Sequence, residues 1–177
     1  MRRRIAVLTL VLVGTVGVVF ANGGFRDLRA TLSGYEEVPT LSSAGSARFQ
    51  ARINRQETAV DWKLSYSDLE GTVTQAHIHL GATATNGPVV VFFCSNLGNG
   101  PVGTQACPAA PATIRGTFAA ADVGPGAEGV GLEAGNLDEL IAALRAGATY
   151  ANVHSNLRPG GEVRGQISAE DGRRRHH

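Results

Sequence analysis

The chain has 177 residues, and its formal net charge at pH 7 is +1. This near-neutral balance excludes a broad basic surface of the kind that binds nucleic acid. Once an N-terminal targeting segment is removed, about 156 residues remain, which suits one domain with a sizeable hydrophobic core.

The N-terminus has the pattern of a secretory signal. Arg2 to Arg4 precede an uncharged run that ends at Ala21, which is the order of a basic region, an apolar region and a small residue before the cleavage site. Cleavage after Ala21 leaves residues 22–27 as a linker. The signal pattern therefore predicts a secreted or periplasmic protein with no membrane contact after cleavage. The alternative is an uncleaved anchor, although an apolar run of about 17 residues is at the lower limit for crossing a bilayer.

The first predicted elements are two strands. Apolar and polar residues alternate over 47–54 and over 60–66, which is the period of two expected of strands with one buried face. The short link at 55–57 predicts that they form an antiparallel hairpin.

Three more strands are expected at 73–80, 88–93 and 113–118. The second of them, PVVVFF, is apolar on both faces. This pattern predicts either a central strand that is covered on both sides or a strand that lies under the loop that a disulfide between Cys94 and Cys107 would close.

One helix is expected after Asn136. Asn136 is a favourable N-cap, and Glu139 stands at the position that completes a near capping box. An apolar stripe follows at helical spacing: Leu137, Leu140, Ile141 and Leu144. Gly147 ends the helix where a left-handed residue is favoured, so the helix is short and is expected to cover one end of the sheets.

The last two predicted strands are 149–155 and 162–168. The Pro-Gly-Gly turn at 159–161 between them predicts a second hairpin. The fold class expected is therefore all-β: an antiparallel, Greek-key-like β-sandwich or barrel of seven or eight strands with one short helix. It spans residues 28–168, and a basic disordered tail follows at 169–177.

Cys94 and Cys107 are the only cysteines. In an exported protein two cysteines at short spacing usually form a disulfide. The loop that it would close is rich in Gly, Asn and Pro, and closing it would contribute about 3 kcal/mol in the chain-entropy model. The alternative, a reactive thiol pair, has neither C-x-x-C spacing nor a neighbouring base in its favour.

The histidines form the candidate site. In QAHIHLG, His77 and His79 share one face of a strand with Gln75, because residues i and i+2 point the same way. The opposite, apolar set is the natural core face, so the histidines are expected to face solvent or a covering loop. His154 lies on the non-core face of another strand. If the two strands are close, these three imidazoles form a suitable set of ligands for copper or zinc.

Glu162 is the acidic residue placed to assist this site, because its strand is expected to pair with that of His154. It is a candidate either to orient an imidazole ring or to ligate a metal directly. The alternatives are that exposed strands carry histidines without a function, or that the three histidines hydrogen-bond the glycine-rich loop after Gly81. The tail residues His176 and His177 are the remaining histidines and could themselves bind metal.

Four stretches resemble the CHRD domain, the module named after chordin. In chain order they are ATLSGYEEVPTLSSAGSARF, QAHIHLGATATNGPVVVFF, NLDELIAALRAG and YANVHSNLRPGGEVRGQI. The resemblance covers residues 28–168 and implies a β-rich extracellular domain without a settled activity. The residues that match the signature are His77, His79, Gly81, Asn86, Gly87, Pro88, Asn152, His154, Pro159, Gly160, Gly161, Glu162, Arg164 and Gly165. Arg164 is expected to pair with a carboxylate on its strand face.

Three classes of function follow from these patterns. The first is an exported binding module that holds copper or zinc through the three histidines, with a protein or envelope component as its partner. The second is a copper-dependent redox enzyme, because copper–zinc superoxide dismutases are similar in placing H-x-H on a β-barrel strand, although this chain has no fourth histidine for that copper site. The third is a structural or adhesive envelope protein without metal. No hydrolase, zincin or phosphate-loop motif indicates catalysis, and the adjacent Glu36 and Glu37 face opposite ways on an extended chain, which does not suggest acid–base chemistry.

Overall fold

The computed structural model describes residues 26–170. The expected signal segment and the histidines of the tail lie outside these residues. Within residues 26–170 no helix combines the length and the apolar composition that crossing a membrane requires.

The described chain is a nearly closed, barrel-like antiparallel sheet. Its elements in chain order are β1 Asp27–Ser33, η1 Gly34–Glu36, β2 Ser46–Ile53, β3 Val60–Ser67, β4 Val73–Leu80, β5 Val89–Ser95, β6 Ala112–Phe118, η2 Ala120–Asp122, η3 Pro125–Val130, α1 Leu137–Arg145, β7 Thr149–Ser155, β8 Val163–Gln166 and β9 Ser168–Glu170. The strand order is β5-β4-β7-β8-β1-β2-β3-β6, and β9 pairs with β1. All neighbouring strands are antiparallel. The predicted fold class is therefore confirmed.

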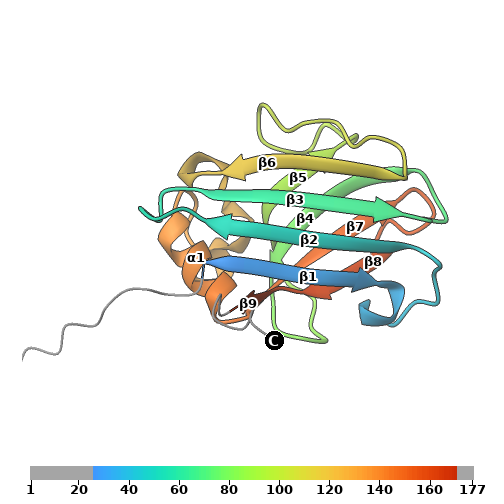
Figure 1. Ribbon diagram of the computed structural model, residues 1–177, viewed down its shortest axis with the longest axis horizontal. Helices are drawn as coiled ribbons and strands as arrows, with labels where there is room; N and C mark the ends of the chain where they lie inside the picture. The colour runs from blue at the N-terminus through green and yellow to red at the C-terminus, as the bar shows by residue number, and fades with distance from the viewer. Residues whose placement is uncertain (1–25, 171–177) are drawn as a thin grey trace, which may run out of the picture.

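Two layers of this sheet face each other. Figure 1 shows β6, β3, β2 and β1 in front, with β5, β4, β7 and β8 behind them. Aromatic side chains meet between the layers: the rings of Phe49 and Trp62 lie 5.4 and 4.8 Å from that of Phe93. Alternating apolar residues from both layers enclose this core, which is why the period-two patterns predicted the strands correctly.

Both predicted hairpins are present. β2 pairs with β3 in continuous register from Ser46 to Ile53, and β7 pairs with β8. The helix also forms as expected: the Asn136 side chain accepts a hydrogen bond from the Glu139 N–H, and the apolar stripe is buried. α1 lies at one end of the two layers (Figure 1).

β1 is the strand that the sequence analysis did not predict. It begins at Asp27, inside the expected linker, and it joins the two layers by pairing with β2 and β8. β9 pairs with β1 and places Ala169 and Glu170 in a strand, so the prediction that residues 169 and 170 belong to a disordered tail is wrong. The physical reason is that β1 offers unpaired backbone groups beyond its short contact with β8, and β9 satisfies them.

β5 lies at one end of the strand order, which excludes the first of its two expected arrangements, a central strand. The alternative, a strand beside the disulfide loop, agrees with the structure. Cys94 is bonded to Cys107, and the Ser95 N–H donates to the Gln105 carbonyl. The second apolar face of β5 contacts the histidine cluster, because Phe92 packs against the ring of His77.

Candidate metal centre

The strand pairing brings the three predicted histidines together. β4 carries His77 and His79, and its neighbour β7 carries His154. In the register, His77 lies opposite Asn152 and His154 lies opposite Gln75, so all three rings project from the same face of adjacent strands. One ring nitrogen from each histidine can be chosen such that all three lie within 4.8 Å of one another. Among residues 26–170, this is the cluster whose atoms are placed to hold a metal ion.

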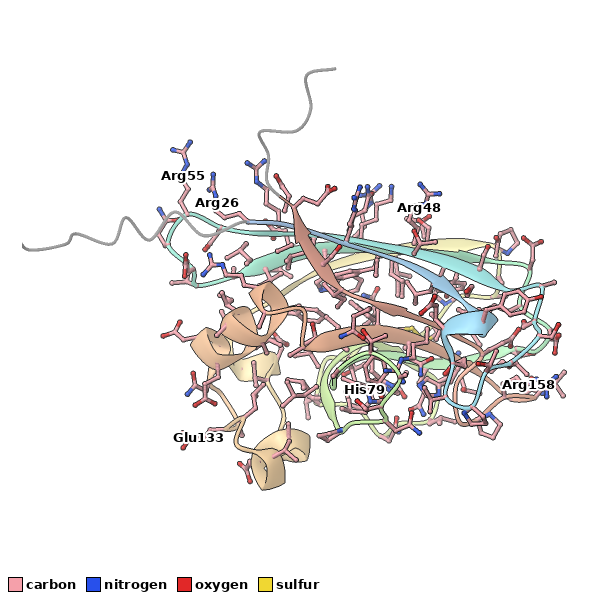
Figure 2. The ribbon with its side chains drawn as sticks, turned by 90° about the horizontal axis from the view of Figure 1, so that it is seen from below. Arg26, Arg48, Arg55, His79, Glu133 and Arg158 are labelled. Carbon is pink, nitrogen blue, oxygen red and sulfur yellow. A yellow bond between two sulfur atoms is a disulfide. The ribbon has the colours of Figure 1, made fainter. Side chains whose placement is uncertain are left out.

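The histidines are buried, although they lie outside the hydrophobic core. His77, His79 and His154 are only 2%, 8% and 5% exposed. Of the two surroundings expected for them, solvent and a covering loop, their burial agrees with the covering loop. Residues 81–88, which we call the covering loop, connect β4 to β5 and lie beside His79 in Figure 2.

Two of the rings are held by backbone carbonyls. Nδ1 of His79 lies 2.8 Å from the Gly87 carbonyl oxygen, and Nδ1 of His154 lies 3.0 Å from that of Pro159. A carbonyl only accepts hydrogen bonds, so each Nδ1 carries a proton and each neutral ring keeps a lone pair on Nε2. Both Nε2 atoms are buried without a hydrogen-bond partner among the described residues.

His77 differs from the other two, because both of its ring nitrogens are buried without a partner in the described part of the chain. Its ring centroid forms a triangle with those of the other two imidazoles, at 5.4 Å from His79 and 4.9 Å from His154, and the ring packs edge-on against Phe92 at 4.5 Å. Buried polar atoms normally have partners, so two unpaired nitrogens on one ring require an explanation.

Burial keeps all three imidazoles neutral. Burial, with smaller contributions from the neighbouring His154 and His79, lowers the pKa of His77 to about 2. Burial also lowers the pKa of His79 to about 4, although the bond to Gly87 opposes this shift. The pKa of His154 is lowered by burial against the opposing effect of its bond to Pro159. Neutral imidazole is the form that ligates metals.

Arg164 fastens the covering loop over the site. Arg164 is 2% exposed, and its guanidinium donates to the Thr85 carbonyl at 2.7 Å, to the Ala82 carbonyl at 3.3 Å and to Asn86 Oδ1 at 3.3 Å. The predicted partner of Arg164 was a carboxylate. The structure shows no such ion pair within residues 26–170, because the loop carbonyls occupy the guanidinium instead.

Tyr150 links this arginine to the histidines. Arg164 Cζ lies 3.4 Å from the centre of the phenol ring, and the His79 ring stacks on the same phenol at 4.7 Å with an interplanar angle of 3°. Two groups cannot both stack on one face, so the phenol lies between them. The Tyr150 hydroxyl also accepts a hydrogen bond from the Gly87 N–H. No local pattern in the sequence indicates this linking role.

Glu162 is fully buried, and its carboxylate forms hydrogen bonds with residues other than the three histidines. One of its carboxylate oxygens accepts from the Ser43 hydroxyl at 3.0 Å and from the Glu70 N–H. The rings of His79 and His154 are oriented by carbonyls, so the structure does not assign Glu162 the orienting role expected of it. The carboxylate instead ties together the segments before β2 and before β4.

Glu37 is a buried acidic residue that the sequence analysis did not select. It is 7% exposed, and burial raises the pKa of its carboxyl to about 7, although the charge of Arg164 and the side chain of Asn152 favour ionisation. Its neighbour Glu36 is exposed. The only signal in the sequence was its position in the GYEEVP segment of the family-like pattern.

Two signature glycines allow close backbone contacts around the site. A Cβ atom on Gly87 would overlap the Leu80 carbonyl oxygen, and one on Gly165 would overlap that of Thr31. Glycine at Gly87 therefore lets the covering loop close onto the end of β4, and at Gly165 it lets β8 approach β1.

The metal-free domain should lose stability as the pH falls below about 6.5, the ordinary pKa of histidine. The unfolded chain binds protons there, whereas folded His77 and His79 stay neutral down to about 2 and about 4. The free energy of unfolding should therefore fall by up to about 1.4 kcal/mol per pH unit for each histidine. Glu37 has the opposite effect between pH 4.5 and about pH 7, because its carboxyl binds a proton more readily in the folded than in the unfolded chain. The three histidines outweigh this single group, so the net effect of acid is a loss of stability.

Urea unfolding in the presence of chelator at pH 5 and pH 7 measures this dependence. The variant His77→Ala should show a smaller difference between the two pH values, because one titrating group is removed. A free energy of unfolding that is the same at both pH values in the parent protein would contradict the neutral, buried state of the cluster.

The fold and the site together define an antiparallel β-domain with a buried histidine cluster beneath a fastened loop. The family model described as CHRD domain matches residues 28–167. The chain therefore belongs to the CHRD domain family, as its motifs indicated. No curated protein and no solved structure matches the chain.

Proposed function

We propose that this CHRD domain is an exported binding module that holds a copper or zinc ion between His77, His79 and His154. The support is geometric and chemical: one nitrogen from each ring lies within 4.8 Å of the other two, and burial keeps each ring in its neutral, ligating form. The hydrogen bonds to Gly87 and Pro159 occupy Nδ1 of two rings, as second partners of metal-bound histidines commonly do, and leave Nε2 of each ring without a hydrogen-bond partner in the described chain.

His77 is the observation that carries this proposal. If the histidines only held loops, His79 and His154 would be explained by their bonds to Gly87 and Pro159. His77 holds no loop, and its two unpaired nitrogens would be left as a cost of burial. A metal ion bound by one of these nitrogens would remove that nitrogen's share of the cost.

The donor set favours copper or zinc over other ions. Three neutral imidazoles suit these two metals, whereas calcium and magnesium prefer oxygen ligands. The two cysteines are joined in a disulfide and supply no thiolate.

Burial favours holding a metal over turning over a substrate. With the three side chains at most 8% exposed, a substrate would reach a bound ion only after the covering loop had moved. That loop is held by Arg164, Tyr150 and His79. This arrangement is the reason to place the binding module ahead of a redox enzyme.

Metal analysis by mass spectrometry tests the proposal. The untagged mature protein, exported to an oxidising compartment, should contain one copper or zinc ion per chain, and His77→Ala should contain none while keeping its circular dichroism spectrum. The control is His176→Ala/His177→Ala, which removes the other two histidines of the chain and should retain the metal. A parent protein that takes up no copper or zinc after reconstitution would overturn the proposal.

A further inference from the structure

The outer face of the front layer is a second functional candidate, remote from the histidines in the fold. It is formed by alternate residues of β1, β2, β3 and β6, whose other faces supply the core. The register aligns side chains in rows across the strands. One row contains Arg29, Gln50, Lys63 and Arg115, and the next contains Thr31, Arg48, Ser65 and Thr113.

This face is basic although acidic residues outnumber basic ones over residues 26–170. It carries the cations Arg29, Arg48, Arg52, Lys63 and Arg115, against the anions Asp27, Asp61 and Glu170. Figure 2 shows arginines, including Arg48, projecting from the sheet surface, while Glu133 projects from the opposite corner near α1. The molecule is therefore electrostatically polarised, with its positive side on the front layer.

Three of these cations have no ion pair within the described chain. Arg29 pairs with Glu170 at 2.6 Å, and Arg52 lies 3.6 Å from Asp27. No acidic partner is found in residues 26–170 for the remaining three, which are Arg48, Lys63 and Arg115. They are neighbours on the surface, since Lys63 is directly opposite Arg115 on the adjacent strand and Arg48 stands in the next row.

The surface around these three cations is hollowed. Two adjoining depressions of about 540 and 560 Å³ share Arg48 and Lys63 in their linings, and the second also includes Arg115. Hydroxyl and amide side chains stand between the cations, among them Thr31, Gln50, Ser65 and Thr113. The side chains thus offer both charge and hydrogen-bonding groups along an extended, shallow surface.

We propose that this face binds an acidic polysaccharide, whose carboxylates pair with Arg48, Lys63 and Arg115 and whose hydroxyls bond to the intervening Ser, Thr and Gln side chains. Guanidinium groups pair well with planar carboxylates. The site is independent of the metal centre, which lies under the covering loop on the outer face of the other layer.

Other macromolecules fit this face less well. The outward positions carry no aromatic side chain on which an unpaired base could stack. The small excess of positive charge is also a poor match for the dense charge of duplex DNA. A protein partner would usually require an apolar or aromatic centre, which these positions lack.

Binding to polygalacturonate, with neutral dextran as the reference, tests this proposal with the full mature protein. Biolayer interferometry should show binding to polygalacturonate alone, and the affinity should fall as the salt concentration rises. The variant Lys63→Gln/Arg115→Gln should bind about 10-fold more weakly, which corresponds to about 1.4 kcal/mol for two lost charge contacts.

The matched control is Arg55→Gln/Arg158→Gln, which removes the same charge from positions outside both depressions. It should change the affinity by less than about 3-fold if the face itself is the site. Equal weakening in both double variants would show attraction by net charge alone and would overturn the proposal. Failure to bind polygalacturonate would overturn it as well, as would tighter binding to a single-stranded DNA of matched charge.

Discussion

Saturation with copper or zinc should raise the free energy of unfolding of the metal-free domain by about 4 kcal/mol when the free ion is about 1,000-fold above its dissociation constant. In the proposed function the ion would bind where His77, His79 and His154 converge, a site that the unfolded chain lacks. It also provides a partner for ring nitrogens that are otherwise buried without one. Urea unfolding with added metal, and again with chelator, measures the difference.

The variant His77→Ala separates this effect from general packing. It should lose the metal-dependent gain completely. Its metal-free form should be near the parent in stability, because the cavity left beside Phe92 is offset by removal of two unpaired buried nitrogens. His176→Ala/His177→Ala should keep the full gain. An undiminished gain in His77→Ala would show that the metal binds elsewhere.

Replacement of Arg164 by methionine should lower the free energy of unfolding by about 3–5 kcal/mol, because three oxygen acceptors lose a buried charged donor at a cost of about 1–3 kcal/mol each. The methionine fills similar space but leaves the carbonyls of Ala82 and Thr85 and the Asn86 side chain without their donor. It also removes the cation from the face of Tyr150. Chemical unfolding of the metal-free protein measures the loss.

The covering loop should also become less protected in Arg164→Met, which amide hydrogen exchange over residues 81–88 detects. Arg158→Met is the control, because its ion pair with Glu70 is 40% and 33% exposed and should be worth less than about 1 kcal/mol. A similar loss of stability in the two variants would show that the buried bonds of Arg164 do not fasten the loop.

Local patterns were sufficient to predict most of the fold. The alternation in β2 and β3 indicates strands with one buried face, and the turn between β7 and β8 indicates a hairpin. Both could be predicted because they depend on residues near one another in the chain. The Asn136 cap and its apolar stripe are local in the same sense. β1 has a similar alternation of Leu28, Ala30 and Leu32, which is also a local pattern typical of a strand.

The position of a strand in the sheet was harder to predict. The apolar run in β5 was compatible with a central strand. A strand covered by a neighbouring layer and a strand covered by a buried site show the same apolar pattern in the sequence. In the structure one face of β5 meets the core through Phe93, and Phe92 meets His77 on the other. Which of the two explanations applies depends on contacts between distant segments.

The sequence by itself determined the all-β class, the disulfide between Cys94 and Cys107, and the common face of His77 and His79, since each follows from spacing along the chain. Only the tertiary structure decided that His154 joins them, because the pairing of β4 with β7 joins segments far apart in the sequence. The structure likewise decided that the cluster is buried and that Arg164 binds loop carbonyls. Burial and hydrogen-bond partners depend on how the covering loop folds back over the sheet, which no periodicity in the sequence encodes.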